Sequence, residues 1–166
     1  MDKLYKPLKI WSEEIAGYHT ALEAMRLPFD KQGKTDSLDL ASRLVRSGDD
    51  HGKFSRGVIA WVTVEMQAGF MIELDTYRIG REVLSTSSSM HNELKDLKGA
   101  ELAEEKQRGI ATKVYRQTFL VSYQTLRRIH MQRRGHRHPD WQIFCDFIET
   151  LPYYDELIRP KKENTK

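Results

Sequence analysis

The sequence predicts an α+β fold: a helix-rich single domain with a small central sheet and a long C-terminal helix pair. Residues 57–64, GVIAWVTV, form a short apolar run rich in β-branched side chains, which is typical of a buried strand. Segments before and after it carry apolar residues at helical spacing. The length of 166 residues suits one domain with a normal core.

Two helices are predicted in the first 50 residues. Over residues 10–27 the apolar side chains recur every three or four positions, and Leu27-Pro28 ends the pattern. A second amphipathic helix is predicted over residues 38–45, ended by the turn-forming SGDDHG. We expect both helices to supply core.

The middle of the chain gives weaker patterns. Residues 65–74 fit a helix or a strand, and Gly69 disfavours the helix. Residues 92–109 are highly charged and predict an exposed helix or excursion with a solvated face.

The C-terminal helix pair is predicted from apolar spacing and from its boundaries. One apolar stripe runs through residues 111–134, and Gly135 can cap this long helix. Pro139 suits the first turn of the following helix, which Leu151-Pro152 ends.

Composition excludes several classes of protein. With 39% apolar and 31% charged residues the chain is an ordinary globular one, and no apolar run approaches the roughly 18 residues that span a bilayer. We therefore expect no membrane partner. The N-terminus lacks the apolar block of a signal peptide, and a single Cys145 permits no internal disulfide, so a cytoplasmic protein is predicted. The net charge of +3 gives no argument for nucleic-acid binding.

Residues 75–91, DTYRIGREVLSTSSSMH, predict one wall of a binding site. An acid, two arginines, a Ser/Thr run and a histidine follow the most apolar segment of the chain. The hydroxyls and backbone N–H groups of residues 85–89 are suited to surround an anion. Such a run is more often a helix cap or a plain loop, so both interpretations stay open.

A second candidate site is the basic block of residues 127–138, RRIHMQRRGHRH. It holds five arginines, three histidines and no acid, and guanidinium groups bind phosphate oxygens in a fork. The alternative is a helix C-terminus whose cations face solvent. The histidines His130, His136 and His138 would bind a metal only if the turn folds back, and we predict no metal site. The common phosphate-loop and hydrolase motifs are absent.

The order of these motifs resembles a known family. DTYRIG, then STSSSMH, and later SYQTLRRIHMQRRGHRHPDWQIF followed by LP, are similar to flavin-dependent thymidylate synthases of the ThyX type, and most of all to short ThyX-like proteins of bacteriophages. The resemblance covers residues 58–151. It implies one ThyX-like domain over residues 1–166, with the predicted helices in 1–50 and a frayed tail in 160–166.

The resemblance also implies roles for single residues. ThyX enzymes carry an RHR motif that contacts flavin and nucleotide; Arg78 matches its first arginine, whereas Ile79 and Gly80 replace the other two. Ser122 stands where the family has an asparagine near the flavin ring. Asp146 stands where a final arginine grips the nucleotide phosphate. The chain therefore lacks arginines of the family motifs at positions where the phosphates of the flavin and the nucleotide would lie. This lack argues against full synthase activity.

We therefore predict non-catalytic binding of a nucleotide or nucleotide-derived small molecule by a homo-oligomer, with a tetramer favoured. The expected role in a phage setting is to sequester a host antiviral nucleotide signal. No catalytic residue and no cofactor are expected. The residues expected to bind phosphate are Arg78, Arg81, Ser85, Ser87, Ser88, Ser89, His91, Arg133 and Arg134, and those expected to stack on or contact rings are Tyr77, Ser122, Trp141 and Gln142.

Two alternatives stay open. One is a divergent flavin-dependent thymidylate synthase or pyrimidine nucleotide (hydroxy)methyltransferase, which would use FAD. The other is a structural or protein-interaction factor whose basic block is a solvated face.

Overall fold

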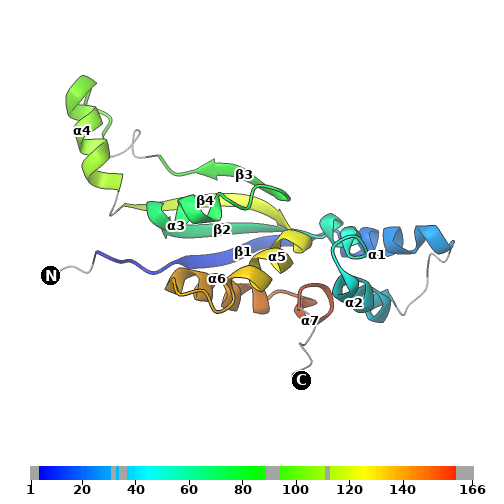
Figure 1. The fold of residues 1–166 in the computed structure, drawn as a ribbon. Coiled ribbons are helices and arrows are strands. Elements are labelled where there is room, and N and C mark those ends of the chain that lie inside the picture. Colours follow the sequence, from blue (N-terminus) through cyan, green and yellow to red (C-terminus); the bar gives the residue numbers. More distant parts are fainter. Residues whose placement is uncertain (1–3, 31–32, 34–36, 89–93, 111–112, 160–166) are drawn as a thin grey trace.

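The computed structural model describes residues 4–30, 33, 37–88, 94–110 and 113–159. An antiparallel sheet in the order β1-β2-β4-β3 lies at its centre (Figure 1), formed by β1 (Lys9–Ala16), β2 (Ile59–Gln67), β3 (Arg81–Thr86) and β4 (Val114–Ser122). The helices are α1 (Tyr18–Arg26), α2 (Ser37–Ser47), α3 (Ala68–Leu74), α4 (Gly99–Ile110), α5 (Tyr123–Arg133), α6 (Pro139–Glu149) and α7 (Tyr154–Leu157), with 3-10 turns η1 (Leu27–Phe29) and η2 (Lys53–Gly57). The α+β class and the small central sheet are confirmed, and α5 and α6 form the C-terminal helix pair.

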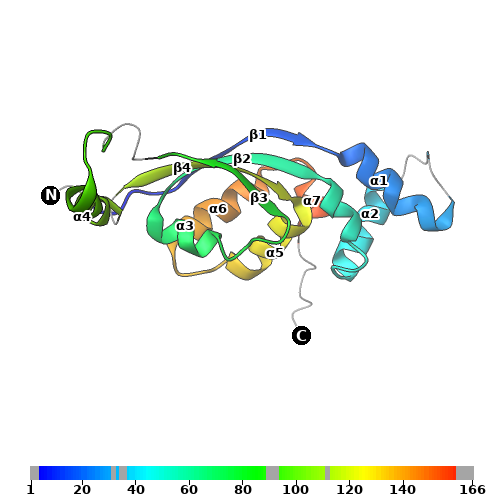
Figure 2. The ribbon, with the colours of Figure 1, turned by 90° about the horizontal axis from the view of Figure 1, so that it is seen from above.

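Helices cover one face of this sheet. Alternate side chains of β2, such as Val62, Val64 and Met66, are at most 1% exposed, because strand side chains alternate between the two faces. They pack with α3, α5 and α6, which all lie on that side of the sheet (Figure 2). The large buried side chains here are Trp141, Tyr123, Phe70, Phe119, Phe144, Leu126, Ile129 and Ile148.

The remaining helices lie at the two ends of the sheet. Figures 1 and 2 place α1 and α2 beyond one end and α4 beyond the other. Most described side chains of α4 are exposed, so the helix is the correct one of the two alternatives, exposed helix or excursion, predicted for residues 92–109. In the part of the chain that the structure describes, no helix is both long and apolar enough to cross a membrane.

The helix predicted over residues 10–27 is wrong in its first half. That half is β1, which pairs with β2, and α1 begins only at Tyr18. Gly17 makes the change of direction: its φ is 92°, and a Cβ there would lie 2.0 Å from the carbonyl oxygen of Gly57. Pairing with a distant strand therefore overrides the local helical spacing. The predicted end at Leu27-Pro28 is confirmed, since α1 ends at Arg26.

The long helix predicted over residues 111–134 is also wrong in its first half. That half is β4, which hydrogen-bonds to β2 on one side and to β3 on the other. Phe119 and Val121 face the core while Leu120 is only partly buried, an alternation with a period of two. The ambiguous residues 65–74 divide in the same way, because β2 ends at Gln67 and α3 begins at Ala68.

Other sequence predictions for helices and strands are confirmed. The strand predicted over residues 57–64 is most of β2, and the helix predicted over 38–45 lies within α2. Pro139 is the first residue of α6, as predicted.

Candidate functional site

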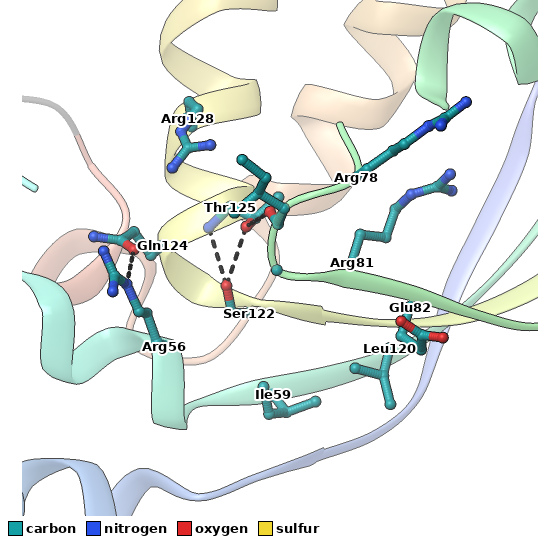
Figure 3. A pocket seen from close by; sticks show the side chains of 12 residues that line it. Arg56, Ile59, Arg78, Arg81, Glu82, Leu120, Ser122, Gln124, Thr125 and Arg128 are labelled. Atoms are coloured by element: carbon teal, nitrogen blue, oxygen red, sulfur yellow. Dashed lines mark hydrogen bonds between the residues drawn. The ribbon is translucent and has the colours of Figure 1, made fainter. Parts of the chain in front are cut away.

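A pocket of about 420 Å³ lies where β3 begins and where β4 passes into α5 (Figure 3). Its walls come from the loop at residues 78–80, the first turn of α5 and the adjoining end of the sheet. The lining residues are Arg56, Ile59, Arg78, Ile79, Gly80, Arg81, Glu82, Leu120, Ser122, Gln124, Thr125 and Arg128. The volume is in the range of small-molecule sites.

Hydrogen bonds fix the loop at residues 78–80 against α5. The Ser122 N–H donates to the carbonyl of Gly80 at 2.8 Å, and the Thr125 hydroxyl donates to the carbonyl of Ile79 at 2.7 Å. Ser122 is also the N-cap of α5, since its Oγ accepts from the Thr125 N–H at 3.3 Å. Both hydroxyls therefore hold the wall of the pocket together.

The loop needs a glycine at position 80. Gly80 has a φ of 76°, and a Cβ there would lie 2.4 Å from the Thr125 Oγ1 and 2.8 Å from the Ser122 Oγ. The resemblance places an arginine of the family motif at this position. With this backbone, an arginine side chain has no room, so the loop is built around glycine.

We expect Gly80→Ala to lower the free energy of unfolding by about 1–3 kcal/mol. Alanine strains the backbone at a positive φ, and its Cβ displaces the Ser122 and Thr125 hydroxyls. Urea denaturation measures the change. The matched control is Gly69→Ala in α3, where a Cβ meets no atom within 4 Å and φ is not left-handed. This control should stabilise by about 0.5–1 kcal/mol. Equal effects of the two substitutions would contradict the close packing at Gly80.

Three arginines of the pocket have no carboxylate partner among the described residues. The Arg56 Nε donates to the Gln124 Oε1 at 2.5 Å, and the Arg78 Nε donates to the backbone carbonyl of Asp75 at 3.2 Å. Arg128 projects from α5 and makes no ion pair with the described part of the chain. Figure 3 shows Arg56 and Arg128 on the same side of the pocket, with Arg78 extending away on the other side. Arg56 and Arg128 therefore form the cationic end of the pocket.

The Arg81 side chain bonds to other protein groups and has little surface open to the pocket. Its side chain is 3% exposed and pairs with Asp75, and its Nη1 donates to the Gln117 Oε1 at 3.0 Å. The guanidinium also lies 4.9 Å from the ring centroid of Phe119. Most of its donor capacity is thus used, although Nε is buried without a partner among the described residues.

The residues predicted to stack on a base lie in the core instead of the pocket. Trp141 is fully buried, and its Nε1 donates to the Glu73 Oε2 at 2.6 Å. The Arg133 guanidinium lies 4.6 Å from the centroid of the Trp141 indole, and its Nε donates to the Tyr77 hydroxyl at 2.7 Å. Neither ring offers a free face to a ligand, so base stacking by Tyr77 and Trp141 is not supported.

Two further residues predicted to bind the ligand, Arg134 and Gln142, bond instead to groups of α6 and of the turn between α5 and α6. Arg134 pairs with Asp146 at 2.5 Å and with Glu149 at 3.2 Å. Gln142 holds the turn after α5, donating to the carbonyl of His136 at 2.6 Å. Asp146 is therefore neutralised by Arg134 at the surface, outside the lining of the pocket.

The Ser/Thr run of residues 85–89 begins in the last part of β3, at the end of the strand away from the pocket. Ser85 pairs with Thr118 across the sheet, and the Ser87 Oγ accepts from the Arg116 N–H at 2.9 Å. Ser88 continues in the same direction and does not line the pocket. Ser89 and His91 lie outside the described residues. The phosphate-binding role of the serines stays a prediction, without support from this pocket.

The basic block spreads around α5, because successive helical residues point in different directions. Arg127 is buried and its Nη1 donates to the carbonyl of Ile158 at 2.9 Å, and burial lowers its pKa. His130 contacts Glu149 at 2.9 Å, whereas the His138 Nδ1 accepts from the Asp140 N–H and caps α6. No group of three potential metal-binding side chains occurs among the residues described. Of the block, Arg128 alone lines the pocket.

Sequence reasoning missed Arg56, Gln124 and Thr125. Arg56 lies in η2, ahead of β2, and meets α5 only because β2 and β4 pair. No local motif marks these residues; a predicted pairing of residues 59–67 with 114–122 would have brought them together.

The pocket carries few groups for acid–base or covalent chemistry. Glu82 is the only carboxylate among its lining residues, which include no histidine, cysteine or lysine. Cys145 is buried elsewhere, and burial raises the pKa of its thiol to about 11, so the thiol stays protonated near neutral pH. The arrangement is suited to holding an anion.

The fold is similar to that of solved structures. No protein-family model and no curated protein matches the sequence. A crystal structure of ThyX from Helicobacter pylori with FAD and dUMP has a TM-score of 0.69 and 12% identity, covering 92% of this chain and 97% of that one. A second ThyX complex from the same organism with FAD and dUMP has a TM-score of 0.70 and 12% identity, covering 91% and 98%. The chain therefore has the fold of the flavin-dependent thymidylate synthases of the ThyX type.

Proposed function

We propose that the chain binds a nucleotide or nucleotide-derived small molecule in this pocket, with its phosphate held by Arg56 and Arg128. The observation that carries the proposal is the pair of guanidinium groups on one side of the pocket, neither of which has a carboxylate partner among the described residues. Such groups bind phosphate oxygens through charge-assisted hydrogen bonds. The ThyX-like fold, whose relatives are complexes with FAD and dUMP, adds support.

The start of α5 strengthens the same end of the pocket. The pocket lining includes Ser122, Gln124 and Thr125, which are the N-cap and the first turn of this helix. The N-terminus of a helix carries a partial positive charge that favours an anion. The helix dipole therefore adds to the positive potential that the two arginines create at this end of the pocket.

We propose that the chain does not carry out flavin chemistry. Gly80 and Ser122, which stand at flavin-contacting positions of the family motif, are packed against each other and against Thr125. This packing does not fit a cradle for a flavin, and we derive no step through FAD. In the biological role that we propose, a phage-encoded chain sequesters a host antiviral nucleotide signal in the host cytoplasm.

The flavin-dependent enzyme remains the second candidate because of the fold of the FAD complexes. Native mass spectrometry and an absorbance spectrum of the purified protein separate the two. The binding proposal predicts a colourless protein that retains or takes up a nucleotide. A yellow protein with a stoichiometric flavin mass would contradict it, and a protein that takes up neither would contradict both candidates.

We also propose that the chain forms a homo-oligomer, with a tetramer favoured by the resemblance. The face of the sheet opposite the helices (Figure 2) supports this. The strand register places Trp11 and Trp61 on this face, and both are only partly buried. Light scattering after size-exclusion chromatography measures the mass; a monomer at micromolar concentration would contradict the proposal.

We expect Arg78→Ala to weaken nucleotide binding by about 1 kcal/mol, roughly fivefold. The effect is modest because Arg78 extends away from the cationic end of the pocket (Figure 3). Stability should hardly change, since the side chain is exposed. Titration calorimetry and a melting curve give both values. A loss of stability larger than the loss of affinity would show that Arg78 serves the loop and not the ligand.

A further inference from the structure

The pocket has a carboxylate on the side away from Arg56 and Arg128 (Figure 3). Glu82 lines the pocket, is exposed, and makes no ion pair with the described residues. Two other carboxylates of the chain differ, because Asp75 and Glu65 each have an arginine partner. An unpaired acid inside a cationic pocket is left to contact the ligand.

The register of the sheet places this carboxylate beside an apolar floor. Glu82 lies directly opposite Leu120 on β4, so both side chains project from the same face of the sheet. Ile59 lies opposite Ser122 in the next strand pair and lines the same pocket. Ile79, which is 77% exposed, adds an apolar side chain from the loop. These aliphatic groups suit the flat face of a base.

The two polar ends are well separated. Figure 3 shows Arg56, Gln124 and Arg128 on one side, Glu82 and Leu120 on the other, and Ile59 between them. A ligand that satisfies both ends has an anion at one end, an apolar ring in the middle and hydrogen-bond donors at the far edge. A free phosphate satisfies only the first of these.

We propose that the pocket selects guanine nucleotides, with the Glu82 carboxylate accepting hydrogen bonds from the base edge. This inference rests on the proposed function. An ionised carboxylate only accepts hydrogen bonds. Guanine presents two adjacent donors, N1–H and the N2 amino group, which match the two oxygens in a bidentate pair. Adenine and cytosine offer a single amino group beside an acceptor. Uracil and thymine offer one N–H between two carbonyl oxygens, which a carboxylate repels.

Titration calorimetry with pyrophosphate, GMP, IMP, AMP and UMP tests this selectivity. For the unmodified protein we expect GMP to bind at least about fivefold more tightly than AMP or UMP, with IMP between them because it lacks the N2 amino group. Glu82→Gln should remove this preference and leave the affinity for pyrophosphate unchanged or improved. The matched control is Glu101→Gln on the exposed α4, which removes a carboxylate far from the pocket and should preserve the preference.

The outcomes separate the two proposals. If pyrophosphate and all four nucleotides bind with equal affinity, guanine selectivity is overturned and the phosphate site stands. A preference for GMP that survives Glu82→Gln also overturns the role of Glu82. If neither pyrophosphate nor any nucleotide binds, the proposed function itself is overturned.

Discussion

Trp141→Ala is expected to lower the free energy of unfolding by about 3–5 kcal/mol, the usual cost of removing a large buried aromatic side chain. The indole is fully buried and its ring centroid lies 4.7 Å from that of Phe70 and 5.7 Å from that of Tyr77. The substitution also removes the hydrogen-bond donor to Glu73 and the ring under Arg133. Denaturant unfolding followed by circular dichroism measures the loss.

Phe29→Ala is the matched control, because Phe29 is an aromatic side chain that is 62% exposed. Its cost should be clearly smaller. If Trp141→Ala instead kept full stability and lost nucleotide binding, the base-stacking role predicted from the sequence would be right and the core role wrong.

The double substitution Arg56→Ala with Arg128→Ala is expected to weaken pyrophosphate binding by about 3 kcal/mol or more, roughly 150-fold. Both guanidinium groups are charged donors at the same end of the pocket, and hydrogen bonds to charged groups are the stronger ones. Titration calorimetry at fixed ionic strength gives the affinity.

Arg43→Ala with Arg137→Ala controls for the change in net charge. Both side chains are exposed and neither lines the pocket, although Arg137 belongs to the basic block of residues 127–138. This control should lose less than about threefold in affinity, by long-range electrostatics alone. Equal losses in the two double variants would mean that general positive charge, and not this pocket, binds the anion.

The fold could be predicted from the sequence wherever local patterns and long-range pairing agree. The run at residues 57–64 and the helix beginning at Pro139 are such cases. In residues 10–16 and 114–122 the local pattern and the pairing disagree. Apolar side chains that alternate along a strand can also recur every three or four residues, which is the spacing of a helix. The strand state of both segments depends on pairing with β2, which is far away in the sequence.

The candidate site could be predicted only in part for a similar reason. The stretch at residues 75–91 is predicted to form one wall of a site, and its Arg78, Gly80 and Arg81 line the pocket. Ser122, predicted separately from the resemblance, lines it too. The dense basic block suggested phosphate binding, yet rotation around α5 sends Arg133 and Arg134 to partners elsewhere. Arg56 comes from a distant turn, so its place in the pocket follows from tertiary structure.

The most direct test of phosphate binding in this pocket follows the arginine side chains by nuclear magnetic resonance. In a protein labelled with ¹⁵N, the Nε–H signals are recorded while pyrophosphate and then GMP are added. We predict that the signals of Arg56 and Arg128 shift and saturate, while those of Arg133 and Arg134, held by Trp141 and Asp146, stay in place. Shifts confined to Arg133 and Arg134, or no saturable shift at Arg56 and Arg128, would contradict the account.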